Sequence, residues 1–152
     1  MKKISKHISY KEATHSNYAK QHKITNKPKE EHIENMELLA EKVFEPLREW
    51  VGCPIRVNSM FRSEKLNSAL KGSKTSSHLK GQAMDITSMA CEKEDCKSNL
   101  DMFHWIKDNL DFDQLIWEFG YEPKWLHVSY SKEKNRKQVL VTKKQGVYRT
   151  WS

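Results

Sequence analysis

The chain has 152 residues, of which 37% are hydrophobic and 31% charged, and it contains five each of Trp, Tyr and Phe. This composition is typical of one globular domain over residues 1–152, and it excludes a disordered chain or one with a membrane-spanning run of about 18 apolar residues. The net charge of +7 favours polyanionic partners such as nucleic acid, anionic lipid or a bacterial cell wall, although a solvated, soluble surface is the simpler explanation.

The N-terminal segment is basic but lacks the apolar stretch that a secretory signal requires. We therefore expect synthesis in the cytoplasm and any later exit by another route. Residues 1–8 are expected to form a flexible N-terminus. Ser9 then has the position of a helix N-cap, and Glu12 completes a capping box for a short helix through about Ala19.

The longest helix is predicted over residues 30–50, where apolar side chains recur at spacings of three and four. Pro46 should kink this helix or divide off its last turn, because proline has no backbone N–H. Gly52 has the position of a C-terminal cap. Two shorter helices are predicted further along the chain, from Ser63 to about Leu70 and from Ser98 or Asn99 onward.

Short alternating runs predict strands in the second half of the chain. The run Ile55–Ser59 alternates apolar and polar residues, as a half-buried strand does. Further candidates occupy residues 81–87, 114–119, 125–130, 138–142 and 147–151. The last two are predicted to pair as a C-terminal hairpin, at about 138–151. Helices followed by mostly consecutive strands indicate an α+β domain, with helices packed on a small antiparallel sheet.

Three cysteines are an odd number in a chain without a secretory signal, so reduced thiols are expected. Cys91 and Cys96 share a charged loop, where a local disulfide or a second metal clip is the alternative. Cys53 precedes Pro54 and is expected to pack at the edge of the core.

The most informative segment runs from Ser77 to Asp85. His78 and Asp85 are seven positions apart, which corresponds to roughly 23 Å in an extended chain. To share a metal ion, the chain must turn between them, and Gly81 is where such a turn is easiest. Beyond it, strand alternation places Asp85 on a face with small neighbours such as Ala83, which leaves room for an ion and a substrate.

A second segment, Trp125 to Tyr130, carries a histidine within a predicted strand. Alternation places Trp125, His127 and Ser129 on one face. Taken alone, His127 is compatible either with core packing or with metal ligation. The other histidines outside the two segments have no matching partners in the sequence: His7, His15, His22, His32 and His104.

Together the two segments resemble the zinc signature of the D-alanyl-D-alanine peptidase family. The pattern is Ser77-His78-x-x-Gly81-x-Ala83-x-Asp85, followed about forty residues later by Trp125-x-His127. The family groups D-alanyl-D-alanine carboxypeptidases and dipeptidases with phage L-alanyl-D-glutamate endolysins, and the hedgehog signalling domain shares the fold. The similarity also includes Pro46-Leu47-Arg48, Pro54-Ile55-Arg56-Val57, Phe61-Arg62-Ser63 and residues 112–118, so it covers roughly residues 9–130.

The resemblance implies a hedgehog-like fold and one catalytic Zn²⁺ ion bound by His78, Asp85 and His127. Two imidazoles and one carboxylate, with a fourth position left for water, are typical of a catalytic zinc site, whereas Mg²⁺ and Ca²⁺ prefer oxygen ligands. Arg62 matches the family arginine that binds the substrate carbonyl and the developing oxyanion; a salt bridge at a helix start is the alternative. Ser77 is expected to hold the ligand loop or to hydrogen-bond to the ligand shell, and Trp125 to form a wall of the substrate cleft. Together with Arg62, both are candidate substrate-binding residues.

The sequence departs from the family pattern at the position of the general base. In the dipeptidase branch it is a Glu three residues before the last histidine ligand, but here Lys124 has that position. Glu118 is the candidate, because its strand is expected to neighbour the His127 strand. Glu122 is the second choice, in what resembles an exposed turn. The alternative for Glu118 is that it orients a ligand histidine.

The sequence thus predicts a zinc metallopeptidase acting on peptidoglycan stem peptides, as a carboxypeptidase or an endopeptidase. The small size, basic charge and missing signal suit a phage-type endolysin, or a bacterial protein of prophage origin, that reaches the wall after release from the cell. We expect a monomer with no nucleic-acid or membrane partner. A non-catalytic zinc-binding module of the same fold is the rival reading; a nucleic-acid-binding domain rests on charge alone.

Overall fold

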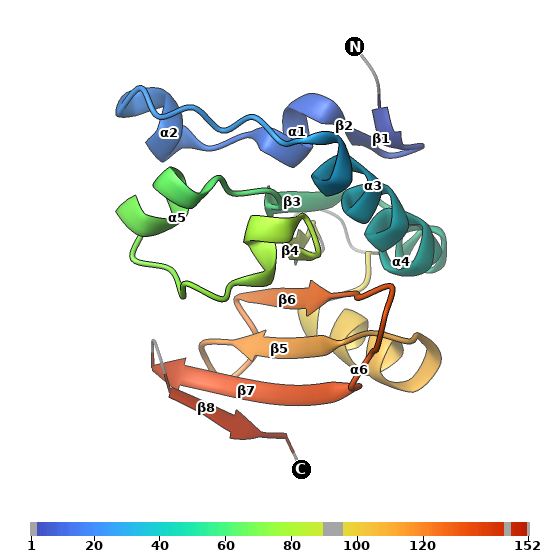
Figure 1. Cartoon of the computed structure of the whole chain (residues 1–152). Helices are drawn as coiled ribbons and strands as arrows, with labels where there is room; N and C mark the ends of the chain where they lie inside the picture. Colours follow the sequence, from blue (N-terminus) through green and yellow to red (C-terminus); the bar gives the residue numbers. More distant parts are fainter. Residues whose placement is uncertain (1–2, 90–95, 145–146, 152) are drawn as a thin grey trace.

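One mixed sheet of six strands organises the computed structural model, which describes residues 3–89, 96–144 and 147–151 (Figure 1). The order across the sheet is β3-β4-β6-β5-β7-β8. The strands are β3 (Ile55–Ser59), β4 (Ala83–Ser88), β5 (Gln114–Glu118), β6 (Trp125–Ser129), β7 (Gln138–Lys144) and β8 (Val147–Thr150). The predicted strands therefore all exist, and β3 has the predicted bounds.

The sheet differs from the prediction in one respect, because β5 and β7 run parallel while the other pairs are antiparallel. The chain leaves β6, crosses through residues 130–137, and pairs β7 with the edge of β5 that β6 does not use. The predicted antiparallel arrangement therefore holds for every strand pair of this sheet except β5 with β7. Alternation shows that a strand exists but not which neighbour it takes. The predicted C-terminal hairpin is present as the antiparallel pair β7 and β8.

The long predicted helix is a continuous rod made of α3 (Glu30–Leu39), a π-helical segment η1 (Ala40–Phe44) and α4 (Glu45–Val51). The π segment comes just before Pro46, which lies in the first turn of α4. It lets the helix pass a residue that cannot donate an N–H and whose ring would clash with a carbonyl of the preceding turn. Gly52 ends the rod with φ +74°, as predicted.

The shorter helices begin at the predicted caps. Ser63 caps α5 (Glu64–Ala69), and Ser98 caps α6 (Asn99–Asn109). The capping box of Ser9 and Glu12 is confirmed. The helix that follows it is shorter than predicted, since α1 (Tyr10–Thr14) ends before a second cap opens α2 (Asn17–Gln21).

The N-terminal residues that the structure describes are joined to the core. Strand β1 (Lys3–Ser5) pairs with β2 (Ile8–Ser9), and Ile4 and Ile8 are buried. The Ser5 hydroxyl and the His7 ring both bond the carboxylate of Glu45 in α4. Residues 3–8 therefore differ from the flexible end that the sequence suggested, because their two isoleucines bury apolar surface.

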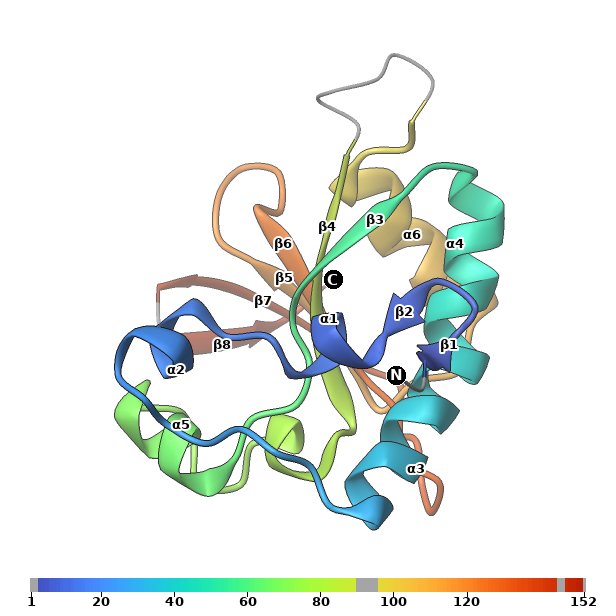
Figure 2. The ribbon, with the colours of Figure 1, turned by 90° about the horizontal axis from the view of Figure 1, so that it is seen from above.

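Helices α3, α4 and α6 lie on one side of β3 and β4, while α2 and α5 lie on the other (Figure 2). The main core fills the first side: Met84 and Ile86 of β4 and Leu126 and Val128 of β6 are fully buried in one apolar cluster with residues of these helices. Alternation then directs Asp85 and His127 to the opposite face. None of the described helices is both long enough and apolar enough to cross a membrane.

Cys53 and Cys96 form a disulfide with a Cα–Cα distance of 6.0 Å. This corrects the expectation of reduced thiols, while Cys53 packs against the core as expected. The two residues meet because β3 pairs with β4, whose last residue Ser88 donates its backbone N–H to Asn99 at the start of α6. The alternative pairing of Cys96 with Cys91 is not formed, and Cys91 itself lies outside the described residues.

Candidate metal centre and active-site cleft

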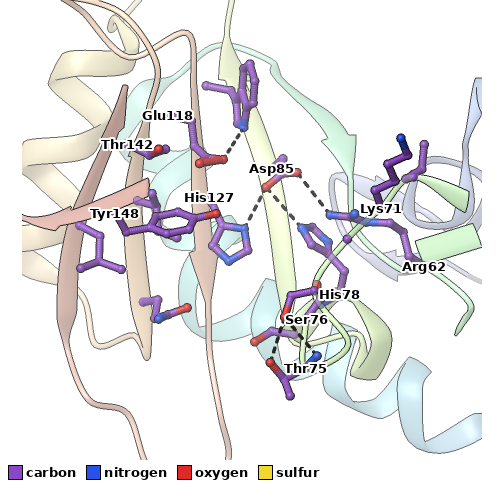
Figure 3. Close-up of a pocket in the computed structure, with 18 of the residues that line it drawn as sticks. Arg62, Lys71, Thr75, Ser76, His78, Asp85, Glu118, His127, Thr142 and Tyr148 are labelled. Carbon is purple, nitrogen blue, oxygen red and sulfur yellow. Dashed lines mark hydrogen bonds and ion pairs between the residues drawn. The ribbon is translucent and has the colours of Figure 1, made fainter. Parts of the chain in front are cut away.

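A cleft of about 690 Å³ opens on the face of the sheet opposite the main core. Its floor carries His78, Asp85 and His127, and its walls come from the loop before η2 (Ser77–Lys80) and from strands β5, β7 and β8. Figure 3 shows the three floor residues directed toward one another. The cleft therefore brings together residues that are up to 49 positions apart in the sequence, from His78 to His127.

His78 is held in the single turn of 3₁₀ helix η2. Gly81 ends that turn with φ +73°, and a Cβ atom there would lie 2.5 Å from the His32 carbonyl oxygen, so both the conformation and the space require glycine. The Nδ1 atom of His78 lies 2.7 Å from the carbonyl oxygen of Met60. Because a carbonyl only accepts, Nδ1 carries the proton and Nε2 presents its lone pair to the cleft.

Asp85 and His127 lie directly opposite each other in the register of β4 and β6. The Asp85 Oδ1 atom is 3.0 Å from His127 Nδ1 and 3.4 Å from His78 Nε2. Although this second distance is short, His78 Nε2 is buried and has no hydrogen-bond partner among the described residues. Burying a ring nitrogen whose lone pair accepts no hydrogen bond costs free energy unless another group binds that nitrogen.

The geometry of the three residues fits a metal ion. One ligand atom from each lies within 4.8 Å of the other two, a spacing that a single ion can bridge. The unpartnered Nε2 of His78 faces this point, and its protonated Nδ1 is fixed by a backbone carbonyl, the usual outer support of a metal-bound histidine. Two nitrogen ligands and one oxygen ligand favour Zn²⁺ over Mg²⁺ or Ca²⁺.

The surroundings of His78 and Asp85 favour the protonation states in which these side chains bind a metal ion. Burial disfavours the charged form of Asp85, but His78 and His127 outweigh it and hold the pKa of Asp85 well below its usual range. Burial lowers the pKa of His78, and Asp85 only partly opposes this. A carboxylate beside a neutral imidazole is the combination that binds a metal cation.

Arg62 lies beside the three residues, with its Nη2 atom 4.0 Å from Asp85 Oδ2. Its Nε atom is buried and has no hydrogen-bond partner among the described residues. Burial lowers the pKa of Arg62, while Asp85 and Glu118 oppose that shift, and a guanidinium remains charged in any case. Among the described residues, Arg62 forms its ion pair with Asp85 rather than with an acidic residue of α5.

Glu118 enters the cleft from β5, which pairs with β6 as expected. Its carboxylate accepts a hydrogen bond of 3.1 Å from the indole N–H of Trp125. Burial and the nearby Asp85 raise the pKa of Glu118, although His127, Trp125 and Arg62 partly offset this. Figure 3 shows Glu118 and Arg62 on opposite sides of Asp85.

The other residues considered for the base lie away from this arrangement. Glu122 is exposed in the turn between β5 and β6, and Lys124, at the position where the dipeptidase branch has its Glu, is exposed as well. Neither lines the cleft, whereas Ser77 and Trp125 do.

The family comparison agrees with this geometry. The family model described as Peptidase M15 matches residues 6–128, which is most of the chain. The chain belongs to this peptidase family. The predicted resemblance and the hedgehog-like α+β fold are thereby confirmed. A search of curated proteins finds no match.

Several residues of this M15 peptidase's cleft were not singled out from the sequence, among them Lys71, Thr142 and Tyr148. Thr142 and Tyr148 belong to the C-terminal hairpin, beyond the family match. Burial, Glu118 and Asp85 raise the pKa of Tyr148, so its phenol keeps its proton and can donate a hydrogen bond. The alternation along β7 and β8 predicts which of their side chains share a face. It does not show that the hairpin borders the cleft, which follows from the parallel pairing of β7 with β5.

Proposed function

We propose that this M15 peptidase is a zinc-dependent hydrolase of peptide bonds in bacterial peptidoglycan stem peptides. The observation that carries the proposal is the convergence of His78, Asp85 and His127 within 4.8 Å, between Arg62 on one side and Glu118 on the other. A structural zinc site would be closed by a fourth protein ligand. This site instead opens into a cleft large enough for a peptide.

His78, Asp85 and His127 would hold a zinc ion, which would supply a Lewis acid to polarise the scissile carbonyl and to acidify the attacking water. The protein supplies the proton transfers. Glu118 accepts the proton of the attacking water on a carboxylate oxygen and returns it to the nitrogen of the leaving amine. Its raised pKa suits both halves of that exchange, and its bond to Trp125 fixes the carboxylate in place.

In this proposal Arg62 stabilises the transition state and transfers no proton. Its guanidinium is always charged and carries a buried Nε–H that no described residue accepts. Placed beside Asp85, it stabilises the negative charge that develops on the carbonyl oxygen in the transition state. Such a donor costs no rearrangement when the charge appears, because burial and Asn67 already position it.

The setting of the reaction extends the proposal. The net charge of +7 gives the enzyme an attraction to anionic wall polymers. We propose a monomer that is made in the cytoplasm and acts on the wall after release, as a phage-type endolysin does, with neither nucleic acid nor membrane as a partner.

One digestion tests the proposal. Purified peptidoglycan is incubated with zinc-loaded protein, new amino groups are counted, and the products are identified by mass spectrometry. The expected result is release of new amino groups at one type of bond, whose identity separates a carboxypeptidase from an endopeptidase. Zinc-loaded protein that releases none would establish the non-catalytic zinc-binding module instead.

A further inference from the structure

The loop from Leu70 to Ser77 forms the wall of the cleft on the Arg62 side. It joins α5 to η2, and the side chains that it directs to the cleft are mainly hydroxyl groups together with one cation, Lys71. The second lysine of the loop, Lys74, is exposed and does not line the cleft. Figure 3 draws Lys71 and Arg62 at the same end of the cleft, with Glu118 at the other. The two ends therefore differ in charge, with cations at one and a carboxylate at the other.

Lys71 has a backbone conformation that favours glycine. After α5, the Lys71 N–H bonds the Ser68 carbonyl at 3.0 Å and the Gly72 N–H bonds the Asn67 carbonyl at 2.8 Å. This is the Schellman pattern, in which the first residue beyond the helix takes a left-handed conformation and is usually glycine. Lys71 occupies that position with φ +59°. A side chain is thus retained where glycine would be less strained.

The strain alone does not indicate function, since Lys23 and Lys137 also have positive φ. Lys71 differs because it lines the cleft, and neither of the other two does. Its loop is also fixed relative to Arg62. The buried Asn67 accepts from Arg62 Nη1 at 3.4 Å and donates to the Ser73 carbonyl at 2.8 Å.

Gly72 completes this link. A Cβ atom there would lie 2.2 Å from Asn67 Oδ1, so the loop can pack on Asn67 only with glycine at this position. The backbone of Lys71 is therefore held at a set place beside Arg62.

Lys71 makes no ion pair with any described residue. The acidic groups of the cleft have other partners: Asp85 lies between the two histidines, and Glu118 bonds Trp125. Lys71 is therefore available to bind an anionic group of a ligand.

We propose that Lys71 binds a carboxylate of the peptide substrate and so sets the direction in which the peptide lies in the cleft. The inference rests on the proposed peptidase function and deepens it. A stem peptide carries two sources of this group, a free C-terminal carboxylate and the carboxylates of acidic residues along the peptide. In either case the anionic part of the peptide lies at the Arg62 end of the cleft.

The test uses Lys71→Gly in zinc-loaded protein. Glycine removes the charge and also relieves the left-handed strain, so the folded protein should melt at the same temperature or higher. Stem peptides are compared in three forms: unmodified, with the C-terminal carboxylate amidated, and with the glutamyl carboxylate amidated. Wild-type protein should show a higher KM for one amidated form.

Lys71→Gly should raise the KM for the unmodified peptide by about fivefold, the effect of one solvent-exposed ion pair, with little change in kcat. Its KM for the discriminating amidated peptide should not change. Whichever amidation the wild type discriminates against identifies the carboxylate.

The matched control is Lys23→Gly, which relieves the same kind of strain outside the cleft and should leave every KM unchanged. Lys71→Arg should keep the preference, since it keeps the charge. A Lys71→Gly protein with unaltered KM and preference would overturn the inference while leaving the peptidase proposal intact. Wild-type protein that cleaves none of the three peptides would instead overturn the peptidase proposal and this inference with it.

Discussion

Strands β4 and β6 carry two surfaces that the protein uses differently. On one face, Met84 and Leu126 are fully buried in the apolar core beneath the helices. On the other, Asp85 and His127 face each other in register and border an open cleft. The same four consecutive ladder pairs thus place adjacent residues in opposite surroundings.

One face of these strands contributes to the stability of the fold, and the other contributes to the chemistry of the cleft. The core face gains free energy by removing apolar surface from water. The cleft face retains features that a stable fold alone would not select, including a buried imidazole nitrogen and a buried guanidinium N–H with no partner among the described residues. Groups of that kind are common where a ligand or a reaction uses them.

The largest expected effect comes from removing a ligand on the cleft face. Asp85→Ala or His78→Ala should lower zinc content to background and activity by several powers of ten, because the remaining two ligands cannot hold the ion. Zinc is measured by atomic absorption after dialysis. His15→Ala, an exposed histidine outside the cleft, is the control. A stoichiometric zinc content in either variant would remove these residues from the ligand set.

Next in size is the proposed base. Glu118→Gln keeps the shape and the contact with Trp125 but cannot accept a proton, so kcat should fall by about 10²–10⁴-fold while zinc content stays constant. Steady-state kinetics on a stem peptide measure the loss. Glu122→Gln, in the exposed turn, should behave as wild type. If the Glu122 variant were the slow one and Glu118→Gln were near normal, the roles would be exchanged.

On the core face, Leu126→Ala should reduce the free energy of unfolding by about 2–5 kcal/mol, since it leaves a cavity among fully buried side chains. The fraction that remains folded should still bind zinc, because the neighbouring His127 points the other way. Urea denaturation and zinc analysis of the same sample check both parts. Val147→Ala, on an exposed strand, should cost far less. Loss of zinc without loss of stability would contradict the division between the faces.

The smallest effect concerns pH. The indole of Trp125 lowers the pKa of Glu118 by donating to its carboxylate, while burial and Asp85 raise it. Trp125→Phe removes the donor, so the pKa of Glu118 should rise further. Because the base works when deprotonated, the acidic limb of kcat/KM should move to higher pH. Trp50→Phe, remote from the cleft, should leave the profile unchanged, and an acidic limb that moved to lower pH in Trp125→Phe would contradict this account.

Much of the fold follows from local patterns. The caps at Ser9, Ser63 and Ser98 and the stop at Gly52 were predictable because each satisfies backbone groups within a few residues. The parallel pairing of β5 with β7 and the disulfide of Cys53 were not, because both depend on contacts between distant segments. Local propensity does not indicate which strand edge is left unpaired and available to β7.

The cleft shows the same limit. His78, Asp85 and His127 were found because two short motifs carried them, and Glu118 because alternation and strand adjacency placed it near His127. Lys71 could have been noticed as a lysine just before Gly72 at the end of a predicted helix, yet that signal does not reveal which wall it borders. Tyr148 depends on the placement of the whole hairpin.

The hairpin of β7 and β8 also affects how the protein behaves in solution. The family match ends at residue 128, within β6, so β5 would be an edge strand without the hairpin. Its backbone N–H and C=O groups would then be open to pairing with another copy of the chain. The hairpin replaces that edge with β8, a strand of four exposed residues that includes Arg149. A strand of four residues with one cation offers little length for pairing with another chain, so we expect the hairpin to limit edge-to-edge association.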